Sequence, residues 1–579
     1  MRATAALAGC AFVAGAVTAA MHSGGSAAPA LAARFAAAWA RGEYGAMYGE
    51  IAPRSRRAIS ATDFAAAYRE ASLLATAWRL RVAGRPRAAA GGVEVVPVTV
   101  RTRLFGTLRG SLRLPIVSPT GANGPRVAWS SSLTFPGLRP GERLHRRTEL
   151  PPRAALLARD GSILAAGSAS AAGQRSSPLG AAASAVVGSV GPIPASRRAA
   201  LEAQGLPASA IVGVSGLELY FDERLRGTPG GELLAGERVL ASATARPGGA
   251  VRTTISPTVQ KAAVEALGGQ YGGVVALEPA SGQILGVAGI GLEGLQPPGS
   301  TFKMVTVTGV LEAGVAKPGT TFPYATSATL DGVQLHNSES ESCGGTLTLA
   351  FAVSCNSVFA PLGVELGAAR LVATAERFGF NHASGIAGAP ESTIPAAADI
   401  QGELAVGSSA IGQDEVLATP LEMGVVASTI ADGGRRPTPT FSLDGARAGS
   451  RGGVAVMSST TAGEVRAMMI EVVRNGTGTS AAIPGVVVAG KTGTAELGGP
   501  NGACTNSQAE AAAGQSRSQE AEANGCDSES NPQSTDAWFA SFAPATDPKI
   551  AVAVLMVRDG FGGATAAPVA RQVLEAGLG

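Results

Sequence analysis

Apolar strands stand at both ends of the stretch from Val251 to the C-terminus, and this arrangement constrains the fold most. Residues 273–278 and 283–288 are two apolar runs joined by Pro279-Ala280-Ser281-Gly282, a pattern typical of a β-hairpin. Three further strands and a last helix are expected at residues 486–497, 537–543, 550–557 and 567–576. Helical runs lie between, so we predict an α+β domain whose sheet is assembled from distant segments.

A polar stretch at residues 498–535 interrupts this pattern. It is rich in Ser, Asn, Gln, Glu, Ala and Gly and has almost no apolar residues. Such a composition cannot form a packed core, so we expect a mobile insertion. A plain solvated loop is the simpler interpretation, and a loop that docks a partner is the alternative.

The chain of 579 residues is long enough for several domains. Residues 30–118 combine helical patterns with alternating strands, which predicts a small α+β unit. Residues 153–249 mix strands, helices and loops. The expected parts are an N-terminal segment (1–27), a small α+β domain (28–120), a second domain (121–250) and a large C-terminal domain (251–579).

The N-terminus carries Met1-Arg2 and then an uncharged, mostly apolar run over residues 3–21. This run approaches the length that spans a bilayer, and Arg2 favours an N-terminus inside the cell. We predict an uncleaved membrane anchor with the rest of the chain outside the cytoplasm. A cleaved signal peptide, with a site near Ala27-Ala28-Pro29, remains an alternative. The lipoprotein-like Leu7-Ala8-Gly9-Cys10 has too short an apolar stretch before it.

The cysteine count fits an exported protein. Apart from Cys10, the chain has four cysteines, Cys343, Cys355, Cys504 and Cys526, and an even number outside the cytoplasm suggests disulfides. Three connectivities are possible; we favour Cys343–Cys355 and Cys504–Cys526, with free buried thiols as the alternative. The net charge of +3 gives no sign of nucleic-acid binding. The four histidines are scattered without zinc-type spacing, so we expect neither metal nor cofactor.

Lysine is scarce, and two of the lysines lie in short motifs. Of 46 basic residues only five are lysines, the rest being arginines. Lys303 ends Ser300-Thr301-Phe302-Lys303, and Lys491 opens Lys491-Thr492-Gly493-Thr494. A desolvated lysine can release its proton and act as a base, whereas arginine stays charged. These two lysines are therefore candidates for chemistry that arginine cannot perform.

The first motif predicts an activated serine. Pro297-Pro298-Gly299 stops any preceding element, so we expect Ser300 to open a helix, where backbone N–H groups favour developing negative charge. Lys303 lies one turn further on and can reach the Ser300 hydroxyl to take its proton. The purely structural alternative is a serine cap followed by a solvated lysine.

The other motifs supply a strand edge and a relay. Lys491 follows an apolar strand, and we expect Gly493 to leave room for an extended peptide while Thr492 and Thr494 bond a carboxylate. Backbone N–H groups of Ser300 and Thr494 would form an oxyanion hole. In Ser354-Cys355-Asn356, Ser354 would relay a proton and Asn356 would hold Lys303 and the substrate amide. A turn glycine and helix caps are the structural alternatives.

With three motifs in this order and spacing, the chain resembles the class B penicillin-binding proteins, and in particular their MecA-like subgroup. Residues 411–420, with Gly412-Gln413, and residues 476–479, 537–539 and 129–161 also resemble segments of that family. The resemblance implies a nuclear-transport-factor-2-like N-terminal domain, a pedestal or dimerisation domain, and a serine transpeptidase domain of β-lactamase-like α+β fold with a central antiparallel sheet. Arg153-Ala154 and the insertion after Leu497 depart from the family pattern.

The resemblance implies cross-linking of peptidoglycan stem peptides. Ser300 would attack a D-Ala-D-Ala end, an amine from a second stem would resolve the acyl-enzyme, and β-lactams would acylate the same serine. Expected partners are stem peptides, β-lactams, the cytoplasmic membrane and a cell-wall glycosyltransferase. A D,D-carboxypeptidase or β-lactamase-like hydrolase is one alternative, although no Glu-x-x-Leu-Asn motif is present. A non-catalytic β-lactam sensor or scaffold is another, but only Met1-Arg2 precedes the apolar run.

Overall fold

A computed structural model describes residues 27–119, 124–167, 173, 175–443, 453–496 and 535–579. The chain divides into two compact units. The N-terminal unit comprises Met1–Leu150, Ala195–Ala208 and Pro229–Ala245, and the C-terminal unit comprises Pro151–Pro194, Ser209–Thr228 and Arg246–Gly579. The predicted anchor with Cys10, the polar insertion up to residue 534, and Cys504 and Cys526 lie outside the described residues. The predicted domain boundaries stay predictions.

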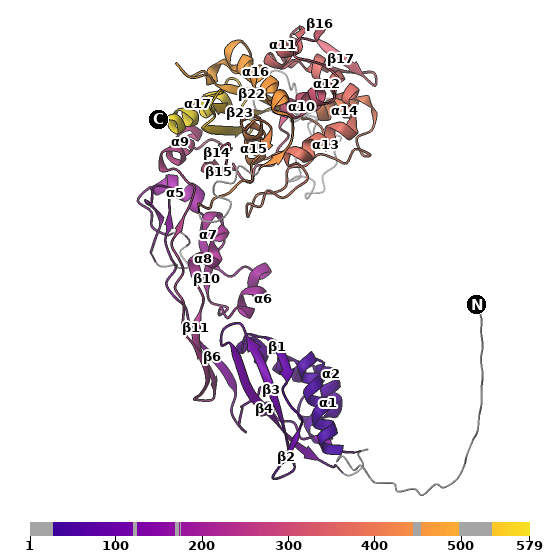
Figure 1. The fold of residues 1–579 in the computed structure, drawn as a ribbon, viewed down its shortest axis with the longest axis vertical. Coiled ribbons are helices and arrows are strands. Elements are labelled where there is room, and N and C mark those ends of the chain that lie inside the picture. Colours follow the sequence, from indigo (N-terminus) through magenta and orange to yellow (C-terminus); the bar gives the residue numbers. More distant parts are fainter. Residues whose placement is uncertain (1–26, 120–123, 168–172, 174, 444–452, 497–534) are drawn as a thin grey trace, which may run out of the picture. The chain divides into compact units, whose positions relative to one another are not determined.

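The N-terminal unit packs helices against one face of a twisted sheet (Figure 1). Its first elements are α1(Ala27–Arg41), α2(Tyr44–Glu50), α3(Pro53–Ala58), α4(Ala61–Leu74), β1(Ala77–Val82), β2(Arg87–Ala89), β3(Val93–Thr102), β4(Thr107–Val117) and β5(Arg126–Val127). Alternate residues of β3 are buried, and they share a core with the aromatic rings of Phe35 and Trp39 on α1 and Phe64 on α4. The helices and strands predicted within residues 30–118 are confirmed.

A second, three-stranded sheet of the N-terminal unit comes from separate parts of the chain. It has the order β12-β11-β6, with β6(Leu144–Glu149), β11(Gly230–Ala235) and β12(Arg238–Ala243). Leu233 and Ala235 on β11 join the same hydrophobic core as α1 and α4. The helix α6(Ala195–Ala203) belongs to this unit as well.

The C-terminal unit is built on a five-stranded antiparallel sheet of order β15-β14-β24-β23-β22. The strands are β14(Gly272–Glu278), β15(Gln283–Gly289), β22(Ala489–Glu496), β23(Thr535–Ala543) and β24(Ile550–Met556). The predicted hairpin and the pairing of distant strands are therefore confirmed. Several bounds differ from the prediction: for example, β22 begins at Ala489 rather than at residue 486, and Thr535 belongs to β23 rather than to the polar insertion.

Helices cover both faces of this sheet, and all nine residues of β23 are buried (Figure 1). On one face lie α9(Pro257–Leu267) and α17(Ala566–Leu578), which confirms the predicted last helix. The other face is covered by α10(Lys303–Glu312), α15(Pro420–Ala431) and much of α16(Ser459–Asn475). The central helix α15 is buried all round, because none of its side chains is charged except Glu422. Because both faces of the sheet are packed, the sheet holds the side chains of its edge strand β22 in fixed positions.

A buried ionic cluster holds together the first segments of the C-terminal unit. Arg153 donates from Nε to Glu218 Oε2 at 2.7 Å and from Nη1 to Asp222 Oδ1 at 2.8 Å. Arg175 donates from Nε to the other Glu218 oxygen at 2.7 Å. The two acids lie on α7(Gly216–Tyr220) and α8(Asp222–Arg226). Arg153 is thus the centre of this cluster. The departure from the family pattern concerns only the next residue, Ala154.

No single helix within the described ranges has the length and apolar composition of a membrane span. One bent pair, α12(Asn356–Leu366) with α13(Ala368–Phe378), passes that test in combination, with a bend of 100°. Most apolar side chains of these helices are buried in the core of the C-terminal unit.

Candidate active site

Ser300 lies in a single 3-10 turn, Gly299–Phe302, that leads into α10. The prediction that Ser300 itself opens the helix was therefore wrong, because α10 begins at Lys303. The turn packs tightly on the sheet edge. Gly299 has φ +51° and approaches β22 so closely that a Cβ there would stand 2.5 Å from the Thr494 carbonyl oxygen. This close approach requires glycine and brings Ser300 beside Thr494.

Lys303 is fully buried and holds the Ser354 motif rather than Ser300. Its Nζ donates to the Ser354 carbonyl oxygen at 2.7 Å and to Asn356 Oδ1 at 2.6 Å. A longer contact of 3.4 Å joins the same Nζ to Ser354 Oγ. The prediction that Asn356 holds Lys303 is confirmed. The expected hydrogen bond from Lys303 to the Ser300 hydroxyl is not among its contacts in the described structure.

Lys491 approaches Ser354 from the sheet. It is fully buried on β22, and its Nζ donates to Ser354 Oγ at 2.8 Å and to the Thr492 carbonyl oxygen at 2.9 Å. Ser354 Oγ therefore stands between the two lysine amines. This position fits the predicted proton relay through Ser354, and the relay itself stays a prediction.

Burial lowers the pKa of both lysines. Desolvation, and then the charge of Lys491, brings the pKa of Lys303 well below its ordinary value. Desolvation alone lowers the pKa of Lys491 from 10.5 to about 7. Within the described residues neither lysine pairs with a carboxylate, and their hydrogen-bond acceptors are neutral oxygens. Lys491 can therefore exist as a neutral amine near pH 7, and Lys303 gives up its proton far more readily than an ordinary lysine.

The segment around Ser354 is held by a disulfide and an asparagine. Ser354 adopts φ +62°, a left-handed conformation that is unusual for serine. The next residue, Cys355, is bonded to Cys343, which confirms the first predicted disulfide. Asn337 Oδ1 accepts from the backbone N–H of Ser357 at 2.8 Å. These contacts fix the start of α12 and hence the Asn356 side chain.

The third motif lies on β22, the edge strand of the sheet, as predicted. Thr492 Oγ1 is 2.5 Å from Thr477 Oγ1. The expectation for Gly493 was wrong, because its missing side chain does not face a ligand. A Cβ at Gly493 would stand 2.8 Å from the Pro298 carbonyl oxygen and 2.9 Å from the Thr301 methyl carbon. Gly493 instead lets the Ser300 turn pack on β22.

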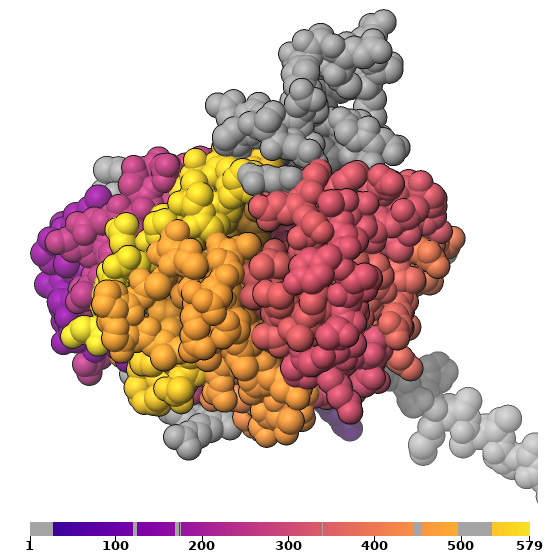
Figure 2. Space-filling view, turned by 90° about the horizontal axis from the view of Figure 1, so that it is seen from above, coloured from indigo at the N-terminus to yellow at the C-terminus, as the bar shows by residue number. Residues whose placement is uncertain are grey.

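Residues of all three motifs line one cavity of about 460 Å³. From the predicted set it is lined by Ser300, Cys343, Ser354, Asn356, Thr492 and Thr494. Lining residues that sequence reasoning did not name as site residues include Asn337, Glu341, Ser480 and Phe561. Figure 2 views the C-terminal unit from the face where the red segments meet the orange and yellow ones. Gln413 and Thr477, which also line the cavity, lie in segments that the sequence singled out only by resemblance.

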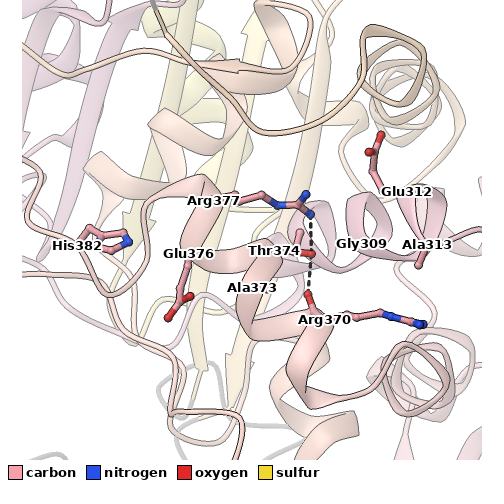
Figure 3. Close-up of a pocket in the computed structure, with 9 residues that line it drawn as sticks. All are labelled: Gly309, Glu312, Ala313, Arg370, Ala373, Thr374, Glu376, Arg377 and His382. Carbon is pink, nitrogen blue, oxygen red and sulfur yellow. Dashed lines mark hydrogen bonds between the residues drawn. The ribbon is translucent and has the colours of Figure 1, made fainter. Parts of the chain in front are cut away.

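A larger hollow of about 590 Å³ lies at the other end of α10 (Figure 3). Its lining includes the charged residues Glu312, Arg370, Glu376 and Arg377, and it contains no residue of the three motifs. Arg377 donates to Thr374 Oγ1 at 3.1 Å, within its own helix. Size alone would favour this hollow. Among the described residues, however, only the smaller cavity is lined by two motif serines, one of which, Ser354, contacts two buried lysines.

Comparison with known sequences gives two family matches. Residues 272–575 match the penicillin binding protein transpeptidase domain, and residues 164–239 match the penicillin-binding protein dimerisation domain. Peptidoglycan D,D-transpeptidase PbpA of Mycolicibacterium smegmatis is 33% identical over 437 residues, which are 63% of this chain and 79% of that protein. PbpA of Mycobacterium tuberculosis is 32% identical over 397 residues, 57% of this chain and 73% of that protein.

Solved structures agree with the sequence matches. The penicillin G acyl-enzyme complex of penicillin-binding protein A from M. tuberculosis aligns with a TM-score of 0.55 at 26% identity, covering 74% of this chain and 100% of that one. The D,D-transpeptidase domain of a peptidoglycan glycosyltransferase from Eggerthella lenta aligns with a TM-score of 0.56 at 30% identity, covering 74% and 98%.

Proposed function

Because this chain belongs to the penicillin-binding protein transpeptidase family, we propose that Ser300 is the nucleophile with which it works as a peptidoglycan D,D-transpeptidase. One observation carries the assignment of residues. Two buried lysines without an acidic partner share the hydroxyl of Ser354, beside a serine that lines the same cavity. This arrangement suits proton transfer to and from Ser300 without a metal or a histidine.

Acylation begins at the penultimate D-alanine of the donor stem peptide. Ser300 Oγ attacks its carbonyl carbon, and the Ser300 proton passes to the neutral amine of Lys303. The Oγ–C bond forms, and the C–N bond to the terminal D-alanine breaks. That leaving nitrogen takes a proton from Ser354 Oγ, and Lys303, protonated in the first step and 3.4 Å from Ser354 Oγ, replaces it. Free D-alanine and a neutral acyl-enzyme result.

Deacylation transfers the acyl group to an amine of a second stem peptide. The amine nitrogen attacks the ester carbon, an N–C bond forms, and the Oγ–C bond breaks while Ser300 Oγ recovers a proton. β-Lactams acylate Ser300 through the same first step. The names of the curated relatives, which are transpeptidases, favour an amine over water as acceptor. Hydrolysis, as in a D,D-carboxypeptidase, is the competing outcome.

The sheet edge would hold the donor. Thr492 and Thr494 line the cavity and offer hydroxyls to the terminal carboxylate of the donor. The backbone N–H groups of Ser300 and Thr494 would stabilise the oxyanion, each donor being worth roughly 3 kcal/mol of barrier. Gly299 supports this assignment, because it brings the Ser300 turn against Thr494.

We further propose a type for the N-terminal unit, a membrane anchor and a partner. The N-terminal unit is of the nuclear-transport-factor-2-like kind found in the MecA-like subgroup and acts as a spacer. Residues 3–21 anchor the chain in the cytoplasmic membrane by a single pass, with the catalytic part outside. A cell-wall glycosyltransferase is the expected partner. The α+β character of the N-terminal unit and the apolar, uncharged run support these proposals.

The test uses the full chain in detergent or membranes with a fluorescent penicillin. We expect covalent labelling of the wild type and none of Ser300→Ala, with Ser281→Ala, a serine in the β14–β15 turn, labelled like the wild type. Labelling that persists in Ser300→Ala would contradict the nucleophile assignment. Product analysis with a D-Ala-D-Ala donor peptide and an amine then separates transfer from hydrolysis.

A further inference from the structure

The active-site cavity has a single ionisable side chain, Glu341, among the described residues that line it. Glu341 lies after β18(Val333–His336), just before β19(Cys343–Thr346), and it is exposed. The other lining residues are neutral, and the two catalytic lysines are buried behind Ser354. Among the described lining residues, this exposed carboxylate is therefore the ionisable group that attracts cations and repels anions.

The backbone of Glu341 is fixed to the catalytic motif on both sides. Asn337 Nδ2 donates to the Glu341 carbonyl oxygen at 2.8 Å, while Asn337 Oδ1 accepts from the N–H of Ser357. Two residues after Glu341, Cys343 is bonded to Cys355, which lies between Ser354 and Asn356. The backbone of Glu341 therefore keeps its position relative to Ser354, so its side chain always extends from the same point of the cavity lining.

The charge of Glu341 does not suit the donor. A donor stem peptide ends in a carboxylate, which Glu341 would repel and which the hydroxyls of Thr492 and Thr494 can bind instead. An acceptor brings a primary amine, which is an ammonium ion in water near neutral pH. The two substrates thus carry opposite charges, and the cavity offers them different groups on different elements.

We propose that Glu341 is a specificity-determining residue that draws the ammonium group of the acceptor to the acyl-enzyme. The proposal rests on the transpeptidase function proposed above. Glu341 favours acceptors whose amine has no carboxylate beside it, because such a carboxylate would be repelled. Glu341 acts on the binding of the acceptor and not on the bond-forming step. The bound ammonium gives up one proton to solvent, and the neutral nitrogen then attacks the ester of Ser300.

Two small acceptors that differ in this one charge provide the test. Glycinamide and glycine are compared as acceptors with a D-Ala-D-Ala donor peptide, and kcat/KM for each acceptor is measured in the full chain. We expect Glu341→Gln to lower the glycinamide-to-glycine ratio of kcat/KM about two- to fivefold, the range for one exposed charge pair. Glutamine keeps the size of the side chain, and the backbone contacts of residue 341 are unaffected.

The matched control is Glu365→Gln, which removes an exposed carboxylate from α12 without touching the cavity lining. It should leave the ratio unchanged. A ratio that is equal in wild type and Glu341→Gln overturns the proposal, also when both acceptors slow together, because a structural or general-base role would act on both. Acylation by fluorescent penicillin, whose carboxylate Glu341 would repel, should be no slower in Glu341→Gln than in the wild type. Loss of labelling only in Ser300→Ala, with an unchanged acceptor ratio, would refute the role of Glu341 and leave the transpeptidase assignment intact.

Discussion

The C-terminal unit buries positive charge in two places and treats it in opposite ways. In the ionic cluster, Arg153 and Arg175 are paired with Glu218 and Asp222, and the side chains of all four are at most 3% exposed. In the active site, Lys303 and Lys491 are equally buried, but their acceptors are neutral oxygens.

The difference teaches where this chain uses each basic residue. A guanidinium keeps its charge, so it is buried only with carboxylates that compensate it. A lysine without such a partner can give up its proton instead, and desolvation drives it to do so. The scarcity of lysine in the sequence fits this division, because lysine is needed where charge must be lost.

The largest effect is expected from placing an arginine in the active site. Lys303→Arg should reduce the rate of acylation by fluorescent penicillin about 1,000-fold or more, because arginine cannot accept the Ser300 proton. Stopped labelling time courses measure this rate. An acylation rate within tenfold of the wild type would mean that Lys303 is not the proton acceptor.

The next effect concerns the compensating acid. Glu218→Gln leaves Arg153 and Arg175 with less negative charge in a buried site, so we expect a loss of about 3–5 kcal/mol in the free energy of unfolding. Chemical denaturation measures it. At a temperature where the variant is folded, the acylation rate should equal that of the wild type. If Glu218→Gln has the same free energy of unfolding as the wild type, the buried arginines do not need carboxylates to compensate them, and the contrast with the lysines fails.

A third prediction concerns stability and pH at Lys491. Its pKa is about 7 in the folded chain and ordinarily 10.5, so between these values the unfolded chain binds more protons. Wild-type stability should therefore rise with pH across this window and be lowest below pH 7. Lys491→Met removes the buried charge and should be more stable than the wild type at pH 6 by about 2–4 kcal/mol.

That advantage of Lys491→Met should shrink as pH approaches 10.5, which pH-dependent denaturation of both proteins will reveal. A constant difference across the range would show that the amine keeps its proton in the folded chain. Lys317→Met, at an exposed position, serves as the control and should show little difference at any pH.

The smallest effect is expected from a lysine in the ionic cluster. Arg153→Lys keeps one charge near Glu218 and Asp222 but loses the forked geometry that gives Arg153 its three hydrogen bonds. We expect a loss of about 1–2 kcal/mol in unfolding free energy. Paired with two acids, the substituted lysine should add no new pH dependence near neutrality. Such a dependence, seen in denaturation midpoints, would show that burial alone decides the protonation state.

The sequence allowed prediction of those features whose residues carry a local signal. The strand patterns gave the sheet, and the three motifs gave Ser300, Lys303, Ser354 and Lys491. The 3-10 turn at Ser300 was missed, because a proline-glycine stop followed by a serine also fits a helix cap. Gly493 was misinterpreted, since the sequence does not reveal which face of β22 meets the Ser300 turn.

The long-range contacts carried no such signal. Arg153 meets Glu218 and Asp222 across 65 and 69 residues, with no spacing that a motif could record. Glu341 and Asn337 enter the cavity only because the Cys343–Cys355 disulfide and α12 bring their segment there. Residues of this kind depend on the packing of distant segments, which patterns within one segment do not encode.

The central claim is that burial lowers the pKa of both active-site lysines far below that of an ordinary lysine, and the low lysine content allows a direct test. The full chain is labelled with ¹³C at lysine Cε, and the five lysine signals are titrated by NMR, with Lys303→Met and Lys491→Met giving the assignments. We predict that the Lys491 signal titrates near pH 7 and that the Lys303 signal titrates well below the pH at which an ordinary lysine does. If both instead keep their ammonium shifts up to about pH 10, the value of an ordinary lysine, the account of the active site is contradicted.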